Sequence, residues 1–438
     1  MRVFGISMAV FLAACGNGSD DTVQDSGEVR DSNTPSPELG ELPPVPENAG
    51  VAYVAHYISP KLVWTRTDGP KAVNGGSLDI EGEAHDMDLD PIRDRLVIVH
   101  DVKKKVAIYQ LDRPQNAADS VDAPELLHSF STDDTPLFTR IDPYHQRLYV
   151  FTTSVDSGKS ALHIYDDSGA TPEFISQMEV PTSAAWDIDP VRQLFFIYDP
   201  DSEGIDVFDM GEDSPQELAG SPIPLREWYP EENSWAFSAR NLRVDPWSAR
   251  VYAGRPQGTV SELMAFSFDA AIPDANSRYN DFADMSTVEK IDDSFDVSIP
   301  YEERHYLLEA HGALSDPEDG LVFLNARAWN GKASTDMVVS MNTNLEELGA
   351  CEDQKNQWCW LRHYSDSEPS TYLMSEGSGC VDRTNNVLVN TTVDITDDEG
   401  AGQIMLYAYE ANGQMTPMLR SNGSNPSAAV YPVDAVCH

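Results

Sequence analysis

The sequence predicts an all-β fold: a seven-bladed β-propeller whose last blade is closed by strands from both chain ends. Three observations support this prediction. An Asp-Pro motif followed by a short turn and an apolar run recurs along the chain, each interval holds about four short apolar runs, and each chain end supplies part of one further repeat. The elements are justified below in chain order.

Residues 1–14 have the features of an export signal. Arg2 supplies a basic start, and the apolar stretch 3–12 is too short to span a bilayer as a mature helix. The text "LAAC" ending at Cys15 resembles the lipobox of bacterial lipoproteins, which implies cleavage before Cys15 and lipid attachment to its sulfur. The following residue is Gly16 rather than the Asp that favours inner-membrane retention in that family, so we expect attachment to the outer membrane. The alternative is an ordinary secretory signal that contains a cysteine.

Residues 15–50 are rich in Gly, Ser, Asp and Pro and have few apolar side chains. Such a segment buries too little surface to offset the entropy of ordering, so we expect a lipidated cysteine followed by a disordered tether. The propeller is then residues 51–438. No later apolar stretch approaches the length of a membrane span.

The chain is strongly acidic, with 73 Asp and Glu against 29 Lys and Arg and a formal net charge of −44. A surface of this sign repels nucleic acid at long range, which argues against a nucleic-acid partner. We interpret the charge as a solubility feature, since cation binding accounts for only a few carboxylates. The hydrophobic content of 41% is sufficient for a globular core.

The Asp-Pro motif sets the repeat. Clear copies read "DLDPIRDRLVIVHD", "RIDPYHQRLYVFTT", "DIDPVRQLFFIYDP" and "RVDPWSARVYAGRP", and the third copy reads as one residue shorter before its apolar run. The mean interval of about 57 residues exceeds the roughly 40–50 of WD and kelch blades. The anchoring acids, with a seventh candidate at the end, are Asp90, Asp142, Asp189, Asp245, Asp316, Asp382 and Asp434.

Each interval is consistent with one four-stranded blade. In the second copy the apolar runs are 137–141, 147–152, 161–165 and 174–180. Residues 51–69 supply strands with no anchor before them, and residues 428–438 supply an anchor strand with nothing after it. Together these ends complete one blade, with the last strand innermost. A solenoid is the alternative, but its terminal repeats need not complement each other.

The repeat resembles the seven-bladed propellers of the lactonase and surface-layer (YVTN-like) group. The shared text is Asp-Pro, two or three variable residues, Arg or Gln, and an apolar run; "SDPEDGLVFL" is a weaker copy and "VDRTNNVLVN" lacks the proline. The resemblance implies architecture over most of residues 51–438. It does not imply an activity, because this fold hosts unrelated functions.

The Asp-Pro pair itself is predicted to be structural. Asp accepts hydrogen bonds from backbone N–H groups two residues on, and Pro presets φ in a tight turn. The residue at the next strand start, which is Arg95, Arg147, Arg250 or, in the third copy, Gln193, is predicted to bond to that Asp or to a neighbouring one.

The predicted ligand site is the channel mouth, seven residues before each anchor. Glu-Ala-His occurs there twice, as Glu83 with His85 and as Glu309 with His311, and residues two apart on a strand share a face. Arg240 is in register with the two histidines, and Glu376 is one residue out of register. The polar positions at this level are Glu83, Thr135, Thr182, Ser238, Glu309, Ser375 and Ser427.

Three chemistries fit these channel-mouth residues. Imidazole and carboxylate together suit a transition metal. A His–Glu base with Arg240 as oxyanion partner suits lactone hydrolysis, which the resemblance makes conceivable, with His85, Arg240, Glu309 and His311 as catalytic candidates. The third interpretation is that these groups satisfy one another and solvent in a wet channel. The two Glu–His pairs lie on blades that are not neighbours, which argues against one shared ion.

Two further patterns bear on cofactors and covalent links. The acidic clusters 199–204 and 394–400 offer oxygen ligands for Ca²⁺, but neither matches an EF-hand loop. Four cysteines after Cys15 allow three disulfide pairings. Cys351 and Cys359 are close enough to bridge a hairpin, which leaves Cys380 with Cys437; a four-thiolate zinc site is the alternative, although no C-x₂-C spacing supports it.

We therefore predict a membrane-anchored lipoprotein of the cell envelope whose propeller binds a small-molecule ligand or an envelope protein. A lactone hydrolase and a metal-binding propeller are the alternatives. The sequence holds no phosphate-binding Gly-rich loop before a helix, no H-E-x-x-H and no G-x-S-x-G.

Overall fold

The fold is that of a computed structural model, in which the chain divides into two compact units, residues 1–36 and 37–438. All described residues lie in the second unit. They are residues 42–56, 60–68, 75–114, 119–182, 185–211, 213–218, 221–225, 242–255, 262–267, 289–290, 295–296, 299–301, 304–329, 334–343, 360–362, 372–394, 402–420 and 432–438.

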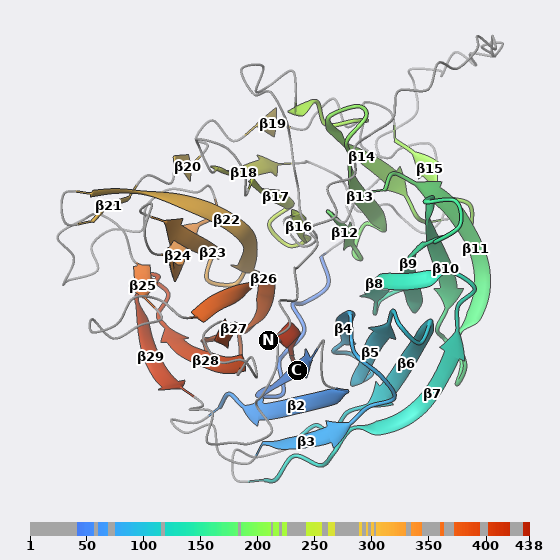
Figure 1. The fold of residues 1–438 in the computed structure, drawn as a ribbon, viewed down its shortest axis with the longest axis horizontal. Helices are drawn as coiled ribbons and strands as arrows, with labels where there is room; N and C mark the ends of the chain where they lie inside the picture. The colour runs from blue at the N-terminus through green and yellow to red at the C-terminus, as the bar shows by residue number, and fades with distance from the viewer. Residues whose placement is uncertain are drawn as a thin grey trace, which may run out of the picture. The chain divides into compact units, whose positions relative to one another are not determined.

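Seven antiparallel sheets surround a common centre as the blades of a propeller, which confirms the predicted fold class (Figure 1). In blades 1 to 3 the first strand is innermost, and each later strand lies one step further out. Blades 1 to 3 consist of β4 (Asp86–Asp90), β5 (Arg95–His100), β6 (Lys105–Gln110), β7 (Glu125–Ser131); β8 (Thr135–Asp142), β9 (Arg147–Thr153), β10 (Ser160–Asp166), β11 (Glu173–Val180); and β12 (Trp186–Asp189), β13 (Leu194–Asp199), β14 (Gly204–Asp209), β15 (Gln216–Glu217).

Blades 4 to 7 continue the ring. Blade 5 has a short extra strand beside its inner strand, β22, and blade 7 combines the last strand with the first three. The strands are β16 (Leu242–Asp245), β17 (Arg250–Arg255), β18 (Glu262–Ser267), β19 (Glu289–Lys290), β20 (Phe295–Asp296); β21 (Ile299–Tyr301), β22 (Arg304–Asp316), β23 (Leu321–Trp329), β24 (Ser334–Asn342), β25 (Trp360–Arg362); β26 (Tyr372–Asp382), β27 (Val387–Asp394), β28 (Gly402–Tyr409), β29 (Met415–Arg420); and β30 (Pro432–Cys437), β1 (Val51–His56), β2 (Lys61–Arg66), β3 (Gly76–Asp79).

Every element of the described ranges is a strand. The described part of the chain contains no helix with the length and apolar character that a membrane span requires. The four strands of blade 2 cover the four apolar runs predicted for the second copy of the repeat.

The ring closes through β30 and β1, as predicted. Val51 N–H donates to the carbonyl of His438 over 3.1 Å, and His438 N–H donates back to Val51 over 2.7 Å. This register corrects one prediction. In blade 1 the anchor Asp90 pairs with the first residue of the next strand, and in blade 7 that place belongs to His438, whereas Asp434 pairs with Ala55. The residue at the anchor's place in blade 7 is therefore His438 and not Asp434.

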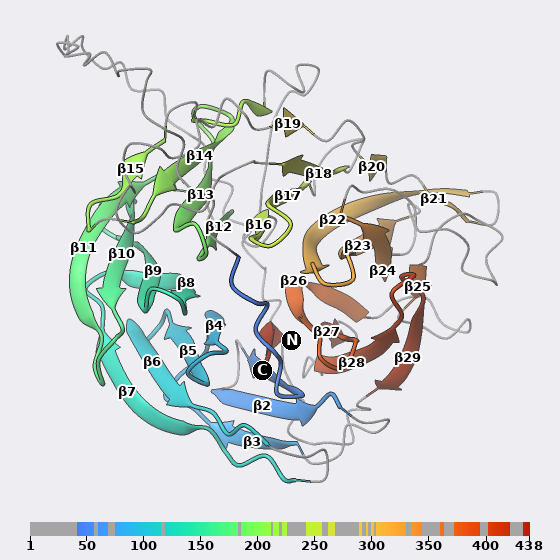
Figure 2. The ribbon, with the colours of Figure 1, turned by 180° about the vertical axis from the view of Figure 1, so that it is seen from behind.

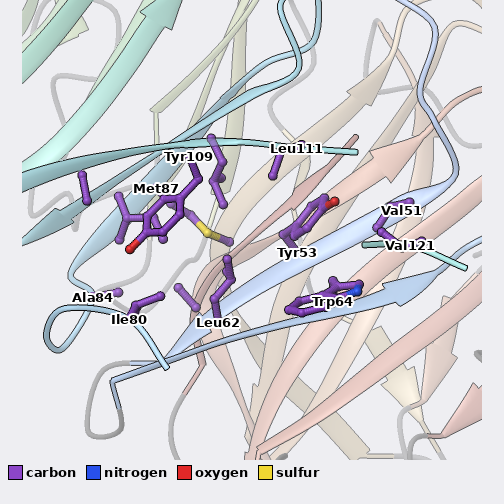
Figure 3. Packing of buried hydrophobic residues seen from close by; sticks show 14 residues of the cluster. Val51, Tyr53, Leu62, Trp64, Ile80, Ala84, Met87, Tyr109, Leu111 and Val121 are labelled. Carbon is purple, nitrogen blue, oxygen red and sulfur yellow. The ribbon is translucent and has the colours of Figure 1, made fainter. Parts of the chain in front are cut away.

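The closing blade packs against blade 1 through a continuous apolar cluster (Figure 3). Tyr53 and Leu62 of blade 7 and Met87 of blade 1 are almost fully buried in it. Successive side chains of a strand point to opposite faces of its sheet, and each face packs against a neighbouring blade. Both faces of these strands are therefore apolar. Burial between blades, rather than within one sheet, therefore forms the core.

The anchoring Asp residues hold the turns between the first and second strands, which confirms their predicted structural role. The Oδ1 atom of Asp90 accepts hydrogen bonds from the backbone N–H groups of Ile92 and Arg93, both at 2.9 Å. Such a bonded carboxylate replaces the missing strand partners of the turn. The same pair of bonds recurs at Asp142, Asp189, Asp245 and Asp316.

The third copy is not shorter than the others, contrary to the sequence interpretation. Asp189 pairs with Leu194 across the turn, as Asp90 pairs with Arg95. Gln193 occupies the left-handed position of the turn, with φ of 56°. The anchor's side-chain partner is instead the residue three positions on, since Arg192 Nη1 lies 2.7 Å from Asp189 Oδ2.

The strand-start arginines bond elsewhere. Arg95 contacts Asp167 at 3.3 Å, and Arg147 contacts Asp213 at 3.2 Å. Both predicted partners were therefore wrong. In both turns the residue before the arginine lies in the left-handed region, with φ of 53° at Asp94 and 54° at Gln146.

Candidate functional site

The centre of the ring is a cavity of about 330 Å³ that all seven inner strands line. The most informative level lies two residues before each anchor. The side chains there are charged in blades 1 to 4 and apolar or sulfur-bearing in blades 5 to 7. In blade order they are Asp88, Arg140, Asp187, Arg243, Leu314, Cys380 and Val436.

Arg140 is the centre of a buried ion network. Its Nε donates to Asp187 Oδ1 over 2.8 Å, its Nη1 lies 3.2 Å from Asp86 Oδ2, and its guanidinium carbon lies 5.1 Å from the centre of the Trp186 ring. Burial lowers the pKa of Arg140, but the carboxylates of Asp187 and Asp86 outweigh burial and raise it above its ordinary value. Arg140 of blade 2 thus links blades 1 and 3 as a permanent cation.

Carboxylates on this wall also bind the backbone of the next blade. Asp88 Oδ2 accepts from Ile141 N–H over 2.7 Å, and Asp187 Oδ2 accepts from Val244 N–H over 2.9 Å. In both cases the carboxylate two residues before the anchor of one blade accepts a hydrogen bond from the backbone N–H one residue before the anchor of the next blade. These contacts fix the angular step between neighbouring blades.

A disulfide occupies the corresponding place between blades 6 and 7. Cys380 and Cys437 are bonded, with their Cα atoms 5.5 Å apart, and both residues line the cavity. This is the pair that remained after Cys351 was assigned to Cys359. Those two cysteines lie outside the described residues, so their pairing stays a prediction.

Asp88 is the most perturbed acid of the cavity. Burial raises the pKa of its carboxyl to about 6, although Arg140 and the backbone N–H donors of Leu89 and Ile141 pull it down. A carboxyl that titrates at about 6 exchanges a proton near neutral pH, which is the property a general base requires. The charged wall therefore offers one group that can accept a proton and one fixed cation.

We expect Asp88→Asn to stabilise the protein at high pH. The pKa of Asp88 is about 6 in the native state and 3.8 ordinarily. Between these two pH values the carboxyl is protonated in the folded protein and ionised in the unfolded chain. Its ionisation therefore lowers the stability as pH rises through about 6, and this effect is absent below about pH 4. D88N should raise the free energy of unfolding by about 3 kcal/mol at pH 8 and leave it unchanged at pH 4.

Urea denaturation at the two pH values checks this expectation. The control is Asp156→Asn, which removes a charge of the same sign from an exposed turn. A D88N protein that is less stable than the wild type at pH 8 would show that Asp88 acts chiefly as a favourable partner of Arg140.

The predicted channel-mouth residues are only partly described. Glu83 and His85 precede β4 rather than lying within it. His85 Nδ1 lies 2.6 Å from the Leu137 carbonyl, and the centres of the His85 and Phe138 rings lie 5.2 Å apart with their planes at 73°. The carbonyl of Glu83 lies 3.0 Å from His100 Nδ1. The imidazole of His85 is therefore engaged with blade 2.

The second Glu–His pair lies on β22, but the strand is irregular there. Glu309 pairs with Arg327, whereas the register shifts between Ala310 and Gly312 and leaves His311 at the extra position. The regular two-residue alternation on which the prediction rested is therefore interrupted in the backbone at this pair. The side chains of Glu309, His311 and, on β26, Glu376 lie outside the described part, as does Arg240 altogether.

No metal centre is found in the part of the chain that the structure describes, where no group of three or more His, Cys, Asp and Glu side chains is arranged to hold an ion. The cluster 199–204 forms a turn in which Asp199 accepts from the N–H groups of Asp201 and Ser202. Most of the cluster 394–400 lies outside the described residues.

The charged wall has a signal in the sequence that a count of seven residues before each anchor does not reach. The four clear copies read "DLDP", "RIDP", "DIDP" and "RVDP", so a charged residue stands two positions before each anchor. Asp and Arg alternate from copy to copy. Four charged residues in strands that otherwise pack on both faces indicate a place where the strands meet a polar interior.

Comparison with known proteins extends to fold alone. The sequence matches no protein-family model and no curated protein. Among solved structures, the periplasmic gluconolactonase of Pseudomonas aeruginosa is similar, with a TM-score of 0.54 and 12% identity over 88% of this chain and 98% of that one. A putative 6-phosphogluconolactonase from Bacteroides uniformis has a TM-score of 0.53 and 11% identity over 88% and 98%.

A protein of unknown function from Desulfotomaculum acetoxidans has a TM-score of 0.53 and 12% identity over 89% of this chain and 99% of that one. The chain thus has the fold of the lactonase-like propellers, which confirms the structural part of the resemblance. At this identity the likeness concerns architecture and not activity.

Proposed function

We propose that the protein is a lipid-anchored propeller of the cell envelope that binds a small, polar, hydroxyl-rich molecule in its central channel. The observation that carries this proposal is the asymmetric wall of the central cavity, whose volume is about 330 Å³. Asp88, Arg140 and Asp187 line one part of this wall, and Leu314 and Val436 line another. Ligand pockets of about 300–1,000 Å³ typically combine apolar walls with a few placed polar groups. Ionic groups already satisfied by one another favour a neutral or zwitterionic ligand over a highly charged one.

Calorimetric titration tests the binding site. The probes are δ-gluconolactone, gluconate and an uncharged hexitol, and the variants are D88N and, as the matched surface control, D156N. Loss of a charged hydrogen bond should weaken binding of a channel ligand by about 10–100-fold in D88N and leave D156N unchanged. Equal affinity in both variants would place the ligand elsewhere.

A lactone hydrolase is the second candidate, and the pKa of about 6 at Asp88 favours it. In such a reaction a water attacks the ring carbonyl while a base takes its proton, the ring C–O bond breaks, and the proton passes to the leaving alkoxide. The similar structures include a gluconolactonase and a putative 6-phosphogluconolactonase, which suggests the lactones to test.

A pH-stat assay on δ-gluconolactone and 6-phosphogluconolactone distinguishes the candidates. Turnover above the spontaneous rate that D88N abolishes would support catalysis in the channel. Turnover that survives in D88N but is lost in His311→Ala or Arg240→Ala would assign it to the channel mouth. A rate equal to the spontaneous one would leave the binding module as the function.

The anchor is tested separately. We expect the wild-type chain to incorporate labelled palmitate and to sediment with membranes when expressed in a Gram-negative host, because acyl chains hold a soluble domain at the bilayer surface. Cys15→Ser should remove the label and shift the protein to the soluble fraction. A C15S protein that stays labelled and membrane-bound would contradict lipidation at this residue.

A further inference from the structure

A proline-rich segment crosses one end of the channel. Residues 42–49 precede β1 and lie over the turn face, defined as the side of the ring that carries the anchoring turns; both views show this segment passing the centre of the ring (Figure 2). The indole Nε1–H of Trp247 donates to the Pro43 carbonyl over 2.9 Å, and Arg383 Nη2 donates to the Pro46 carbonyl over 3.1 Å. The segment is therefore bound by blade 4 at one end and blade 6 further along.

Asn48 fixes the segment at the channel itself. Its Nδ2 donates to the Cys437 carbonyl over 2.8 Å, and its Oδ1 accepts from Arg383 N–H over 3.1 Å. Its own N–H donates to Thr384 Oγ1 over 2.8 Å. Asn48 lines the same cavity as the ion network, so the segment forms part of the cavity wall on the turn face.

The two residues that hold the prolines are departures from the repeat. Trp247 stands two positions after its anchor, where the earlier copies have Ile92, Tyr144 and Val191. Arg383 follows Asp382 directly, where the other copies have proline. Its guanidinium lies 5.8 Å from the centre of the Trp247 ring, so the two side chains form one surface.

This surface has the chemistry of a polyproline site. Proline has no N–H, so a proline-rich segment bonds through its carbonyls and its ring faces, and aromatic side chains with N–H donors recognise it. Trp247 and Arg383 supply one such donor to each of two prolines three residues apart. Three residues is the repeat of a polyproline II helix, which returns successive carbonyls to the same side.

We propose that residues 42–49 are a built-in stopper, seated in a Trp247–Arg383 polyproline site, that closes the channel at the turn face and makes it a pocket entered from the other side. The stopper acts on the same channel as the proposed ligand site. The test of the stopper uses no ligand. Its outcome is therefore independent of whether a ligand of the proposed site is found.

The disulfide between Cys380 and Cys437 serves as an internal reporter, because it lines the cavity beside Asn48. The rate of its reduction by tris(2-carboxyethyl)phosphine is followed in the folded full chain by alkylation and peptide mapping. Arg383→Ala removes the bond to Pro46, and Trp247→Phe removes the bond to Pro43 but keeps the ring. We expect reduction about tenfold faster or more in R383A, since loss of one charged hydrogen bond shifts an opening equilibrium by that factor, and several-fold faster in W247F.

Arg147→Ala is the matched control, since Arg147 pairs with Asp213 away from the segment. Its rate should equal that of the wild type. Wild-type rates in both R383A and W247F would overturn the proposal, and so would an equal acceleration in R147A, because it would report general loosening. Circular dichroism confirms folding, and W247F carries the test if R383A does not fold.

Discussion

Replacing Arg140 with methionine is expected to lower the free energy of unfolding by about 3–5 kcal/mol, the cost of breaking a buried ion pair from one side. The substitution leaves the carboxylates of Asp86 and Asp187 buried without their cation. Methionine keeps much of the volume against Trp186, so the loss reports charge rather than a cavity. Guanidinium denaturation followed by tryptophan fluorescence measures it.

Arg147→Met is the matched control, because its partner Asp213 is mostly exposed and such pairs contribute about 0–1 kcal/mol. The two variants differ in what the lost arginine leaves behind. R140M leaves two buried carboxylates without their cation, whereas R147M leaves one carboxylate in contact with water. A loss no larger than that of R147M would show that the network is solvated.

Removing the disulfide is expected to have the second large effect. The Cys380→Ala, Cys437→Ala double variant should lose about 4 kcal/mol of stability, the chain-entropy value for a loop of this length. The bond spans 57 residues in sequence and joins blade 6 to the closing strand β30. Hydrogen exchange should then rise most in β30 and β1, whose pairing closes the ring.

The comparison that isolates this bond is the wild type, which shares every other cysteine with the double variant. Each single variant leaves a free thiol in the cavity and is therefore a poorer control. A loss below about 1 kcal/mol would mean that the pairing of β30 with β1 holds the ring closed without the covalent link.

The sequence and the structure agree best where local chemistry decides. The strands of blade 2 and the hydrogen bonds of Asp142 follow from apolar runs and turn residues that lie within a few positions of one another. The closing blade was also predictable, because unpaired inner and outer strands at opposite chain ends complete each other. The likeness to lactonase-type propellers adds architecture and no residue roles.

The candidate site agrees less well, and the reason is register. The predicted mouth was found by counting seven residues back along regular strands. The backbone register of β22 shifts between Ala310 and Gly312, and Glu83 and His85 precede β4, which starts at Asp86, so that count does not follow regular strands at either pair. Counting two residues back stays within the regular part of every inner strand and reaches the cavity.

The span 15–50, predicted as a tether, ends in a segment that the structure describes. Residues 42–50 lie against Trp247, Arg383 and Cys437, whereas the tether before them stays a prediction. A composition rich in proline indicates an extended chain but does not identify a binding surface. That surface needs side chains from blades 4 and 6, which the sequence separates widely.

The sequence by itself determined the strand class, the number of blades, the turn chemistry and the way the ring closes, because each depends on local preferences repeated along the chain. Only the tertiary structure decided that His438 takes the last anchor's place, that Arg140 bridges Asp86 and Asp187, and that a proline-rich segment covers the channel. These features arise where different blades meet. Contacts of that kind depend on the angle and stagger between sheets, which no local pattern of residues specifies.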